Sequence, residues 1–146
     1  MIHRWVPLRV ANERVAAWHS YLPAARGCIY SLGAYDGDQC VGVVVVGRPV
    51  ARALDDGRHA EVIRLVTNGR PNAASFLLGH ARRVAQSMGF AMPLGSYIRE
   101  GEPGTCYTAA GWTADDRAVR AESWRRGSRP ARADVLAGTR KRRVTR

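Results

Sequence analysis

The stretch EVIRLVTNGRPNAAS (residues 61–75) passes from strand-like chemistry to the start of a helix across one polar loop. Residues 60–67 predict a strand, in which successive side chains point to opposite faces. The expected faces are Glu61, Ile63 and Leu65 on one side and Val62, Arg64 and Val66 on the other. The polar loop then leads to Asn72, the expected N-cap of a helix.

That helix spans residues 74–88 and is the clearest in the sequence. Its apolar residues recur three and four positions apart, so they form one stripe that packs on a sheet, and Gly89 is placed to end the helix. The stripe consists of Ala74, Leu77, Leu78, Ala81, Val84, Ala85 and Met88. The N–H groups of a first helical turn attract phosphates, and Arg70 adds a positive charge beside them. The loop is therefore a candidate phosphate site, with an ordinarily capped helix and a surface arginine as the alternative.

Outward from this unit, the chain alternates between helical and strand patterns. A short helix is expected from the N-cap Asn12 to Pro23, and residues 28–35 and 39–46 predict two strands joined by an Asp36-Gly37 turn. Three further elements are expected: a strand over residues 90–98, a short helix over residues 104–110, and one or two closing strands at Trp112 and residues 118–124. This order is typical of an α/β domain.

Composition points to one soluble domain. With 146 residues, 46% of them hydrophobic, the chain is long enough for a single core. It has no apolar run of the roughly 18 residues that a membrane span needs and no signal-peptide pattern, so we expect a cytoplasmic protein without a membrane partner. The four histidines show no metal-ligand spacing, and no metal is expected. Buried free thiols are expected at Cys28, Cys40 and Cys106.

The net charge of +11 is concentrated near the C-terminus. Residues 125–146 contain nine basic residues and one acid, and we expect them to form a flexible basic tail after a domain of residues 1–124. Such a tail attracts phosphate backbones without reading sequence, or else only keeps the chain in solution. Of the 23 basic residues in the chain, 22 are arginines, a bias that codon usage also produces.

Three local matches make the chain resemble the GNAT family of N-acyltransferases. Residues 61–67 resemble the family's central strand, whose backbone pairs with the pantetheine arm of acyl-CoA. The loop from Arg70 stands where the family has Arg/Gln-x-x-Gly-x-Gly/Ala, with Ala73 in place of the first glycine and Ser75 at the last small position. Tyr107-Thr-Ala-Ala-Gly-Trp resembles the family's Tyr-x-x-x-Gly-Phe ending.

This resemblance, over about residues 5–124, implies a single α/β (α+β) domain with a mixed central sheet of about six to seven strands and about three to four helices. It also implies acetyl-CoA or another acyl-CoA as the cofactor. The residues that it places at the cofactor are Leu65, Val66, Thr67, Arg70, Asn72, Ala73, Ala74 and Ser75.

Acyl transfer to an amine needs a base for the amine proton and an acid for the departing thiolate. Glu61 is the first candidate base and His19 the second, and the resemblance gives Tyr107 the role of the acid. A backbone N–H near Leu65 or Val66 would polarise the thioester carbonyl. The alternatives are a solvated carboxylate at a strand end, a surface imidazole and a core or rim tyrosine.

A closer similarity rests on segments spread over most of the chain. They include His19 with Pro23, residues 47–52, 55–57, 61–65, 67–69 and 71–73, residues 100–105 and 109–112, and residues 123–124 and 128–130. In these the chain is similar to small phage- and prophage-encoded GNAT-like proteins near the Mom DNA-modification protein, which acts in a system that alters the exocyclic amine of adenine in phage DNA.

This similarity implies DNA as a partner, in the cytoplasm of a bacterial host. An adenine acceptor has to be flipped out of the stack and held by phosphate contacts. The residues expected to make those contacts are Arg48, Arg52, Arg140, Lys141, Arg142 and Arg143. Two other functions stay open: an acetyltransferase for a small amine or a protein, and a GNAT-shaped nucleic-acid-binding protein without catalysis. Monomer and homodimer both remain open.

Overall fold

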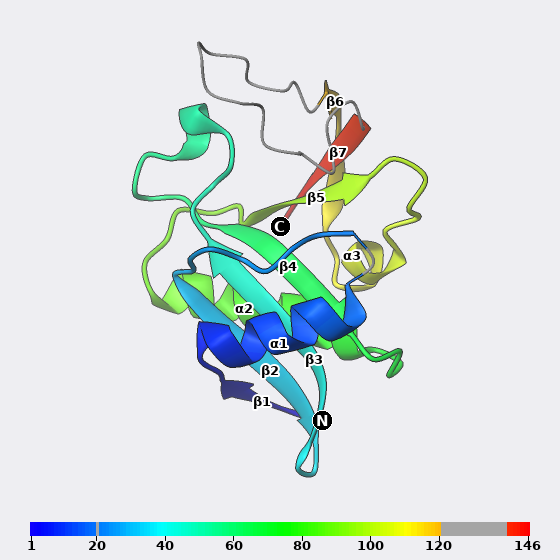
Figure 1. The fold of residues 1–146 in the computed structure, drawn as a ribbon. Helices are drawn as coiled ribbons and strands as arrows, with labels where there is room; N and C mark the ends of the chain where they lie inside the picture. Colours follow the sequence, from blue (N-terminus) through cyan, green and yellow to red (C-terminus); the bar gives the residue numbers. More distant parts are fainter. Residues whose placement is uncertain (20, 121–139) are drawn as a thin grey trace, which may run out of the picture.

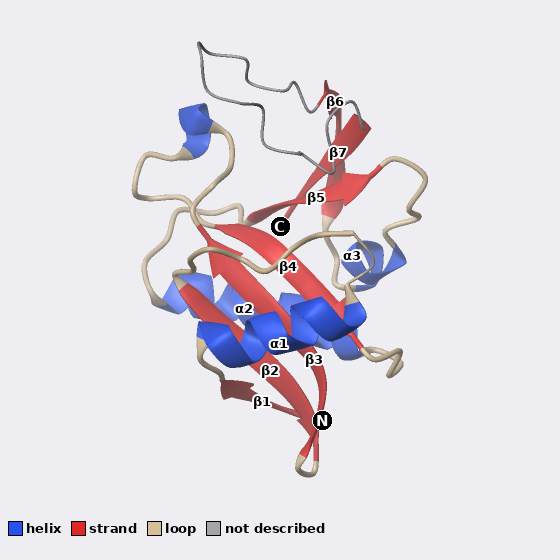
Figure 2. Ribbon diagram, viewed as in Figure 1, coloured by secondary structure: helices blue, strands red, loops and turns tan. Residues whose placement is uncertain are grey.

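A computed structural model describes residues 1–19, 21–120 and 140–146 of the chain (Figure 1). These residues form a seven-stranded sheet of order β1-β2-β3-β4-β5-β7-β6 with helices on both sides (Figure 2). The strands are β1 (Ile2–Trp5), β2 (Tyr30–Asp36), β3 (Gln39–Gly47), β4 (Glu61–Thr67), β5 (Gly95–Arg99), β6 (Thr113–Arg120) and β7 (Arg140–Thr145). The helices are α1 (Leu8–Trp18), α2 (Ala73–Ser87) and α3 (Thr105–Ala109), with a short 3-10 helix, η1 (Arg52–Leu54). The predicted mixed α/β fold is confirmed.

The first four strands of the chain form an antiparallel series. The turn between β2 and β3 contains Gly37, whose φ of +57° carries no steric penalty for glycine. Residues 43–46 of β3 are four valines, all fully buried, because α1 and α2 pack on opposite sides of this strand. The predicted hairpin is confirmed, and its second strand pairs with a strand on each side. The sequence pattern does not predict β1, whose four residues are all exposed at the sheet edge.

The two long helices cover opposite faces of the sheet (Figure 1). Ala11 and Val15 of α1 belong to the smaller core cluster, and Leu77 and Leu78 of α2 belong to the larger one. The predicted apolar stripe of the second helix is confirmed for Leu77, Leu78, Ala81, Val84 and Ala85. It is wrong for Met88, which follows the end of α2 and is 49% exposed. Each helix buries its stripe on its own side, so both faces of β3 and β4 are shielded from water.

Helix α1 begins at Leu8, after Pro7, rather than after Asn12. Proline suits a helix start, since its missing N–H is not needed there. The side-chain amide of Asn12 instead donates to the carbonyl of Ala25 and accepts from the Ala25 N–H, both at 2.8 Å. The predicted N-cap therefore fastens the loop after α1 to the helix itself.

Strand β4 contains a bulge. In its pairing with β3, Arg64 lies opposite Val45 and Val62 lies opposite Val46, so Ile63 is an extra residue. A bulge shifts the residues beyond it to the other face, and the strict alternation predicted for β4 is wrong for this reason. Toward α1, Val66 is buried and Ile63 is partly buried; toward α2, Val62 is buried and Leu65 is partly buried.

The other half of the sheet consists of β5, β7 and β6, with β7 in the middle. Strand β5 begins at Gly95, later than expected. The segment Arg140–Thr145, expected in a flexible tail, pairs antiparallel with β5 and with β6 as β7. Its only apolar residue, Val144, is buried, so neighbouring strands rather than an apolar pattern hold it in place. Residues 125–139 of the expected tail and residues 121–124 of the expected closing strand lie outside the described residues.

Strands β4 and β5 run parallel and separate soon after they meet. Within the described residues their pairing is confined to one Cα pair, Glu61 with Gly95. Ser96 of β5 still reaches the carbonyl of Val62, but beyond that residue no strand among the described residues pairs with this edge of β4, which lines a cleft. The candidate functional site lies where these two strands separate.

Candidate functional site

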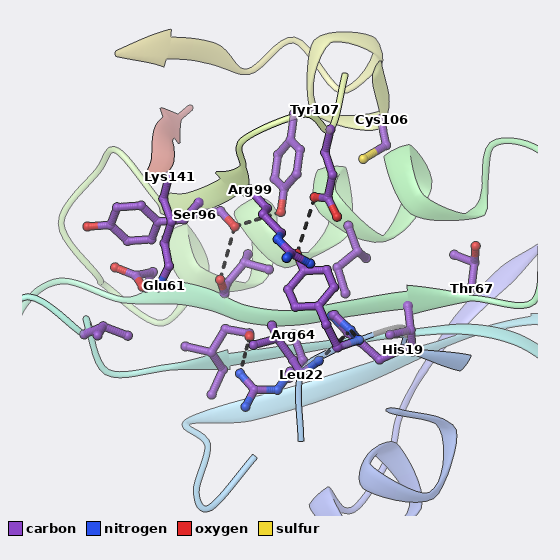
Figure 3. A pocket seen from close by; sticks show the side chains of 18 of the residues that line it. His19, Leu22, Glu61, Arg64, Thr67, Ser96, Arg99, Cys106, Tyr107 and Lys141 are labelled. Atoms are coloured by element: carbon purple, nitrogen blue, oxygen red, sulfur yellow. Dashed lines mark hydrogen bonds between the residues drawn. The ribbon is translucent and has the colours of Figure 1, made fainter. Parts of the chain in front are cut away.

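A cleft of about 440 Å³ lies between β4 and β5 (Figure 3). It is lined by the whole of β4, by parts of β5, α3 and β7, and by the loop after α1. All three predicted catalytic residues, Glu61, Tyr107 and His19, lie on its walls. Segments far apart in the sequence thus bring a carboxyl group, a phenol and an imidazole to one hollow.

Glu61 is the first residue of β4 and is only 2% exposed. Burial disfavours the charged carboxylate and raises the pKa of Glu61 to about 7. The N–H of Val50, which donates to the carboxylate, and the positive charges of Arg143 and Lys141 act in the opposite direction and lower it. A carboxyl group with a pKa near neutrality is suited to accept a proton at neutral pH and release it again.

Tyr107 in α3 is 9% exposed, and its ring meets Trp112 edge to face with centroids 5.4 Å apart. Its hydroxyl lies 2.8 Å from Oγ of Ser96, which itself donates to the carbonyl of Val62 at 3.2 Å. A serine hydroxyl has one proton, so Tyr107 is the donor to Ser96. Burial raises the pKa of Tyr107 well above its ordinary value, and the phenol keeps its proton.

His19 follows α1, and its Nδ1 accepts hydrogen bonds from the N–H groups of Tyr21 (3.3 Å) and Leu22 (3.1 Å). Burial and the nearby charge of Arg64 lower the pKa of His19, while Glu102 raises it. In the neutral ring, the proton is then on Nε2. Because the lone pair of Nδ1 already accepts these two hydrogen bonds, His19 orders the loop after α1. Its free ring nitrogen, Nε2, then carries a proton and acts as a hydrogen-bond donor rather than as a base.

Several cleft residues were not predicted as part of the site. The Tyr21 hydroxyl lies 3.4 Å from the carboxylate of Glu102, and the Arg99 guanidinium lies 4.8 Å from the centre of the Tyr21 ring. Arg64 donates to the carbonyl of Pro23 at 2.7 Å, which ties the loop after α1 to β4. These residues come from separate segments and form no spaced motif, so no sequence signal points to them.

The predicted cofactor residues divide into two groups. Leu65, Val66 and Thr67 line the cleft. The second group begins α2: Asn72 occupies the N-cap position with φ of +64°, and Ser75 donates to its carbonyl at 3.1 Å. Asn72 is therefore confirmed as the N-cap, although its side chain makes no capping hydrogen bond in the described loop. The remaining members are the buried Ala73 and the half-buried Ala74.

Arg70 lies just before α2, and its guanidinium donates to the carboxylate of Asp36 in the turn between β2 and β3. The hydrogen bond from Arg70 is the main cause that holds the pKa of Asp36 below its ordinary value. The predicted phosphate-binding arginine therefore lies at the N-terminal end of α2, as a phosphate site requires, but it is already paired with a carboxylate.

The basic residues of β7 differ in position. Lys141 lines the cleft and Arg142 is exposed. Arg143 packs over Gly95, and its guanidinium lies close to the position that a Cβ atom on residue 95 would occupy. The side chain of Arg140 lies outside what the structure describes. The segment expected as a loose tail thus forms part of the cleft wall.

Arg48 and Arg52 belong to the connection between β3 and β4. Arg48 donates to the carboxylate of Asp55 at 3.0 Å, and Arg52 is the first residue of η1. Neither lines the main cleft. Arg48 instead borders a second hollow, shared with Arg26 and Arg64.

Other expected features of the chain bear less directly on the site. In residues 1–19, 21–120 and 140–146, no three His, Cys, Asp or Glu side chains lie close enough to hold a metal ion. No described helix is long and apolar enough to cross a membrane. All three cysteines are free thiols; Cys28 is exposed, and Cys40 and Cys106 are partly buried, so the expectation of buried thiols is wrong for Cys28.

Solved structures share this fold over 80–99% of the chain. An acetyltransferase of the GNAT family from Streptococcus pneumoniae matches with a TM-score of 0.61 and 12% identity, over 99% of this chain and 98% of that one. The chain has the GNAT fold. The ribosomal-protein-S18-alanine N-acetyltransferase from Escherichia coli gives a TM-score of 0.66 at 12% identity, over 99% of this chain and 91% of its own. A Bacillus subtilis acetyltransferase, solved in complex with CoA, gives 0.57 at 13% identity, over 80% and 74%.

Sequence comparison alone finds nothing: neither a protein-family model nor a curated protein matches the chain. The predicted resemblance is confirmed as a GNAT fold, and the closer similarity to Mom-like phage proteins stays a prediction. In this GNAT fold the cleft lies where two parallel strands diverge, with Glu61 at the point of divergence and Tyr107 on the opposite wall.

Proposed function

We propose that this protein is an acyl-CoA-dependent N-acyltransferase whose active site is the cleft between β4 and β5. The observation that carries the proposal is the pairing, in one cleft, of Glu61, whose pKa is about 7, with Tyr107, a buried phenol that keeps its proton. Transfer of an acyl group from a thioester to an amine needs such a base and such an acid. The CoA-bound Bacillus subtilis neighbour supports the choice of thioester.

The residues present fit an acyl-CoA at two places. Past Glu61 the edge of β4 faces the cleft without a described strand partner, so the backbone of Leu65, Val66 and Thr67 is available to the amide groups of a pantetheine arm. At the end of β4, the first turn of α2 leaves N–H groups without intrahelical acceptors, and these suit a pyrophosphate. The residues that would hold the phosphates are Arg70, Asn72, Ala73, Ala74 and Ser75.

Each group in the cleft then has one role. A bound acyl-CoA supplies the activated acyl group. Glu61, as the carboxylate, takes the proton of the acceptor amine, directly or through a water molecule. An N–H near Leu65 or Val66 donates to the carbonyl oxygen, where negative charge develops. Tyr107 gives its proton to the departing sulfur, and Ser96 orients the phenol hydroxyl beforehand.

Calorimetric titration with acetyl-CoA tests the first requirement of the proposal. We expect saturable binding in the micromolar range, with Glu61→Gln and Tyr107→Phe retaining that binding. No heat of binding at high micromolar concentration would refute the acyltransferase and leave the non-catalytic nucleic-acid-binding protein as the better function.

For the acceptor, we propose the exocyclic amine of adenine in DNA. Strand β7 supports this choice, because it brings Lys141 to the cleft and because the positive charges of Lys141 and Arg143 both act on Glu61. Lysine and arginine contacts to phosphates position a nucleic acid without reading its sequence. An adenine flipped out of the stack then reaches Glu61 through the open side of the cleft.

Nucleoside mass spectrometry of DNA from expressing cells tests the acceptor. We expect a modified adenine with the wild-type protein and none with Glu61→Gln. An unchanged adenine profile from a protein that binds acetyl-CoA would exclude DNA adenine and leave a small amine or a protein as the acceptor.

A further inference from the structure

Lys141 is the single lysine among the 23 basic residues of the chain. Every other basic position carries arginine, including its neighbours Arg140, Arg142 and Arg143. A bias toward arginine explains the 22 arginines but not the exception. The exception is the basic residue of β7 that lines the cleft.

The position of Lys141 is fixed by two strands. It pairs with Arg99 of β5 on one side and with Val119 of β6 on the other, in the middle of the antiparallel half of the sheet. From there its side chain extends across the cleft toward Glu61 (Figure 3). Successive residues of a strand point to opposite faces, so Arg142, the next residue, points away from the cleft and is exposed.

Lysine and arginine are equivalent as positive charges but not as nucleophiles. For a phosphate contact, the planar guanidinium of arginine serves at least as well as an ammonium group. Only lysine offers a primary amine that becomes nucleophilic once it loses a proton. A contact with phosphate alone therefore gives no reason for a lysine at this position, whereas amine chemistry does.

We propose that Lys141 is an internal acyl acceptor: the protein transfers the acyl group of acyl-CoA to the Nζ of its own Lys141 in the same cleft. This inference rests on the proposed function, since it uses the same thioester, base and acid. It adds an acceptor that is part of the chain and that needs no second substrate.

The step balances with the groups already in the cleft. The ammonium of Lys141 gives one proton to the carboxylate of Glu61, and the free amine attacks the thioester carbon. A C–N bond forms, the C–S bond breaks, and the sulfur leaves with the proton of Tyr107. The new amide nitrogen gives up its second proton, which restores the phenol of Tyr107, and Glu61 returns its proton to water. Nothing is oxidised or reduced.

Acylation would also change the electrostatics of the site. An amide at position 141 carries no charge, so one of the two cations near Glu61 disappears. Loss of that positive charge raises the pKa of Glu61 further and weakens it as a base at neutral pH. It also removes one contact for an anionic acceptor. The modified chain is therefore a less active form of the same enzyme.

Mass spectrometry of the full-length protein after incubation with acetyl-CoA tests the proposal. We expect the intact mass to rise by one acetyl group and peptide mapping to place that group on Lys141 rather than on the amine of Met1. The reaction should be first order, with a rate constant independent of protein concentration, because the acceptor and the active site belong to one molecule. Glu61→Gln should slow it by about 100-fold or more, as expected for loss of a general base.

A double variant provides the matched control. Lys141→Arg combined with Arg142→Lys keeps the composition and charge of β7 but moves the only lysine to the exposed face of the strand. We expect this variant to be acetylated no faster than urea-denatured wild-type protein. Equal acetylation of the double variant and the wild type, or a rate proportional to protein concentration, would overturn the proposal.

Titration of the same preparation with acetyl-CoA separates the two levels of inference. Binding of acetyl-CoA without acetylation of Lys141 above the denatured control overturns the internal acceptor and leaves the proposed function standing. Absence of binding overturns the proposed function, and the internal acceptor falls with it.

Discussion

The hydroxyl oxygens of Ser96 and Tyr107 lie 2.8 Å apart, and the phenol proton points at the serine. Ser96 belongs to β5, and its own proton is directed to the carbonyl of Val62 in β4. This chain of two hydrogen bonds crosses from α3 through β5 to β4 just past the point where the two strands separate. It fixes the orientation of the phenol before any ligand binds.

Replacing Tyr107 with Phe should lower kcat by about 100-fold or more, since the thiolate would leave without a proton donor. The loss of one buried hydrogen bond should destabilise the fold by only about 1 kcal/mol. Tyr30→Phe is the matched control, because the Tyr30 hydroxyl is also buried and donates to the carbonyl of Ala81 at 2.5 Å, away from the cleft. A similar drop in kcat for both variants would assign the effect to structure rather than to proton transfer.

The rate of acyl transfer should rise with pH through about 7. The pKa of Glu61 is raised to about 7 by burial, so the carboxylate that accepts the amine proton forms only as the pH passes that value. A pH profile of kcat/KM should show this rise in the wild type and in Glu13→Gln, a variant on the exposed side of α1. In Glu61→Gln the rise should vanish along with most of the activity. A rise that persists in Glu61→Gln would come from the titration of another group.

Glu61 should also make folding stability depend on pH. Its pKa is about 7 in the folded chain against an ordinary value of 4.5, so the unfolded chain releases the proton first as the pH rises. The stability from the protonated group is complete below about pH 4.5 and is lost by about pH 7, a change on the order of 3 kcal/mol. Urea denaturation measures the free energy of unfolding of Glu61→Gln and of the wild type at about pH 4 and about pH 8. The difference between the two proteins should shift in favour of Glu61→Gln at the higher pH. Equal differences at the two pH values would contradict the raised pKa.

Arg70 and Asp36 should affect acyl-CoA binding in opposite directions. Arg70→Ala removes a cation from the expected phosphate site and should raise the Kd for acetyl-CoA. Asp36→Asn removes the carboxylate that shares the charge of Arg70 and should lower the Kd, by roughly twofold to fivefold for an exposed pair. Calorimetry at low and high salt checks both, because screening shrinks both effects. A tighter complex with Arg70→Ala would place the phosphates elsewhere.

The sequence predicts the parts of the site that carry local patterns. Glu61 begins a strand-like run, Tyr107 sits at a fixed spacing before a glycine, and the helix after Asn72 has an apolar stripe. Each pattern lies within a few residues, so single-sequence reasoning can find it. The bulge at Ile63 has no such pattern, because it is set by the pairing with β3.

Strand β7 shows why the rest could not be predicted. The sequence RKRRVT looks like a solvated basic segment, since nothing in it alternates between apolar and polar. Its place between β5 and β6 depends on backbone pairing with both neighbours and on burial of Val144. The role of Lys141 follows from that place. His19 is a similar case, because only the folded loop shows that its Nδ1 is already occupied.

The central position of β7 in its half of the sheet also sets an order of local opening. Within the described residues, β6 pairs only with β7, whereas β7 pairs with β5 as well. The amide protons of β6 are therefore shielded from exchange with solvent only while β7 is in place, but β7 can stay bound to β5 after β6 has detached. In a hydrogen-exchange experiment, β6 should exchange no more slowly than β7. When this end of the sheet opens locally, β7, the strand that carries Lys141, thus stays paired after β6 has detached.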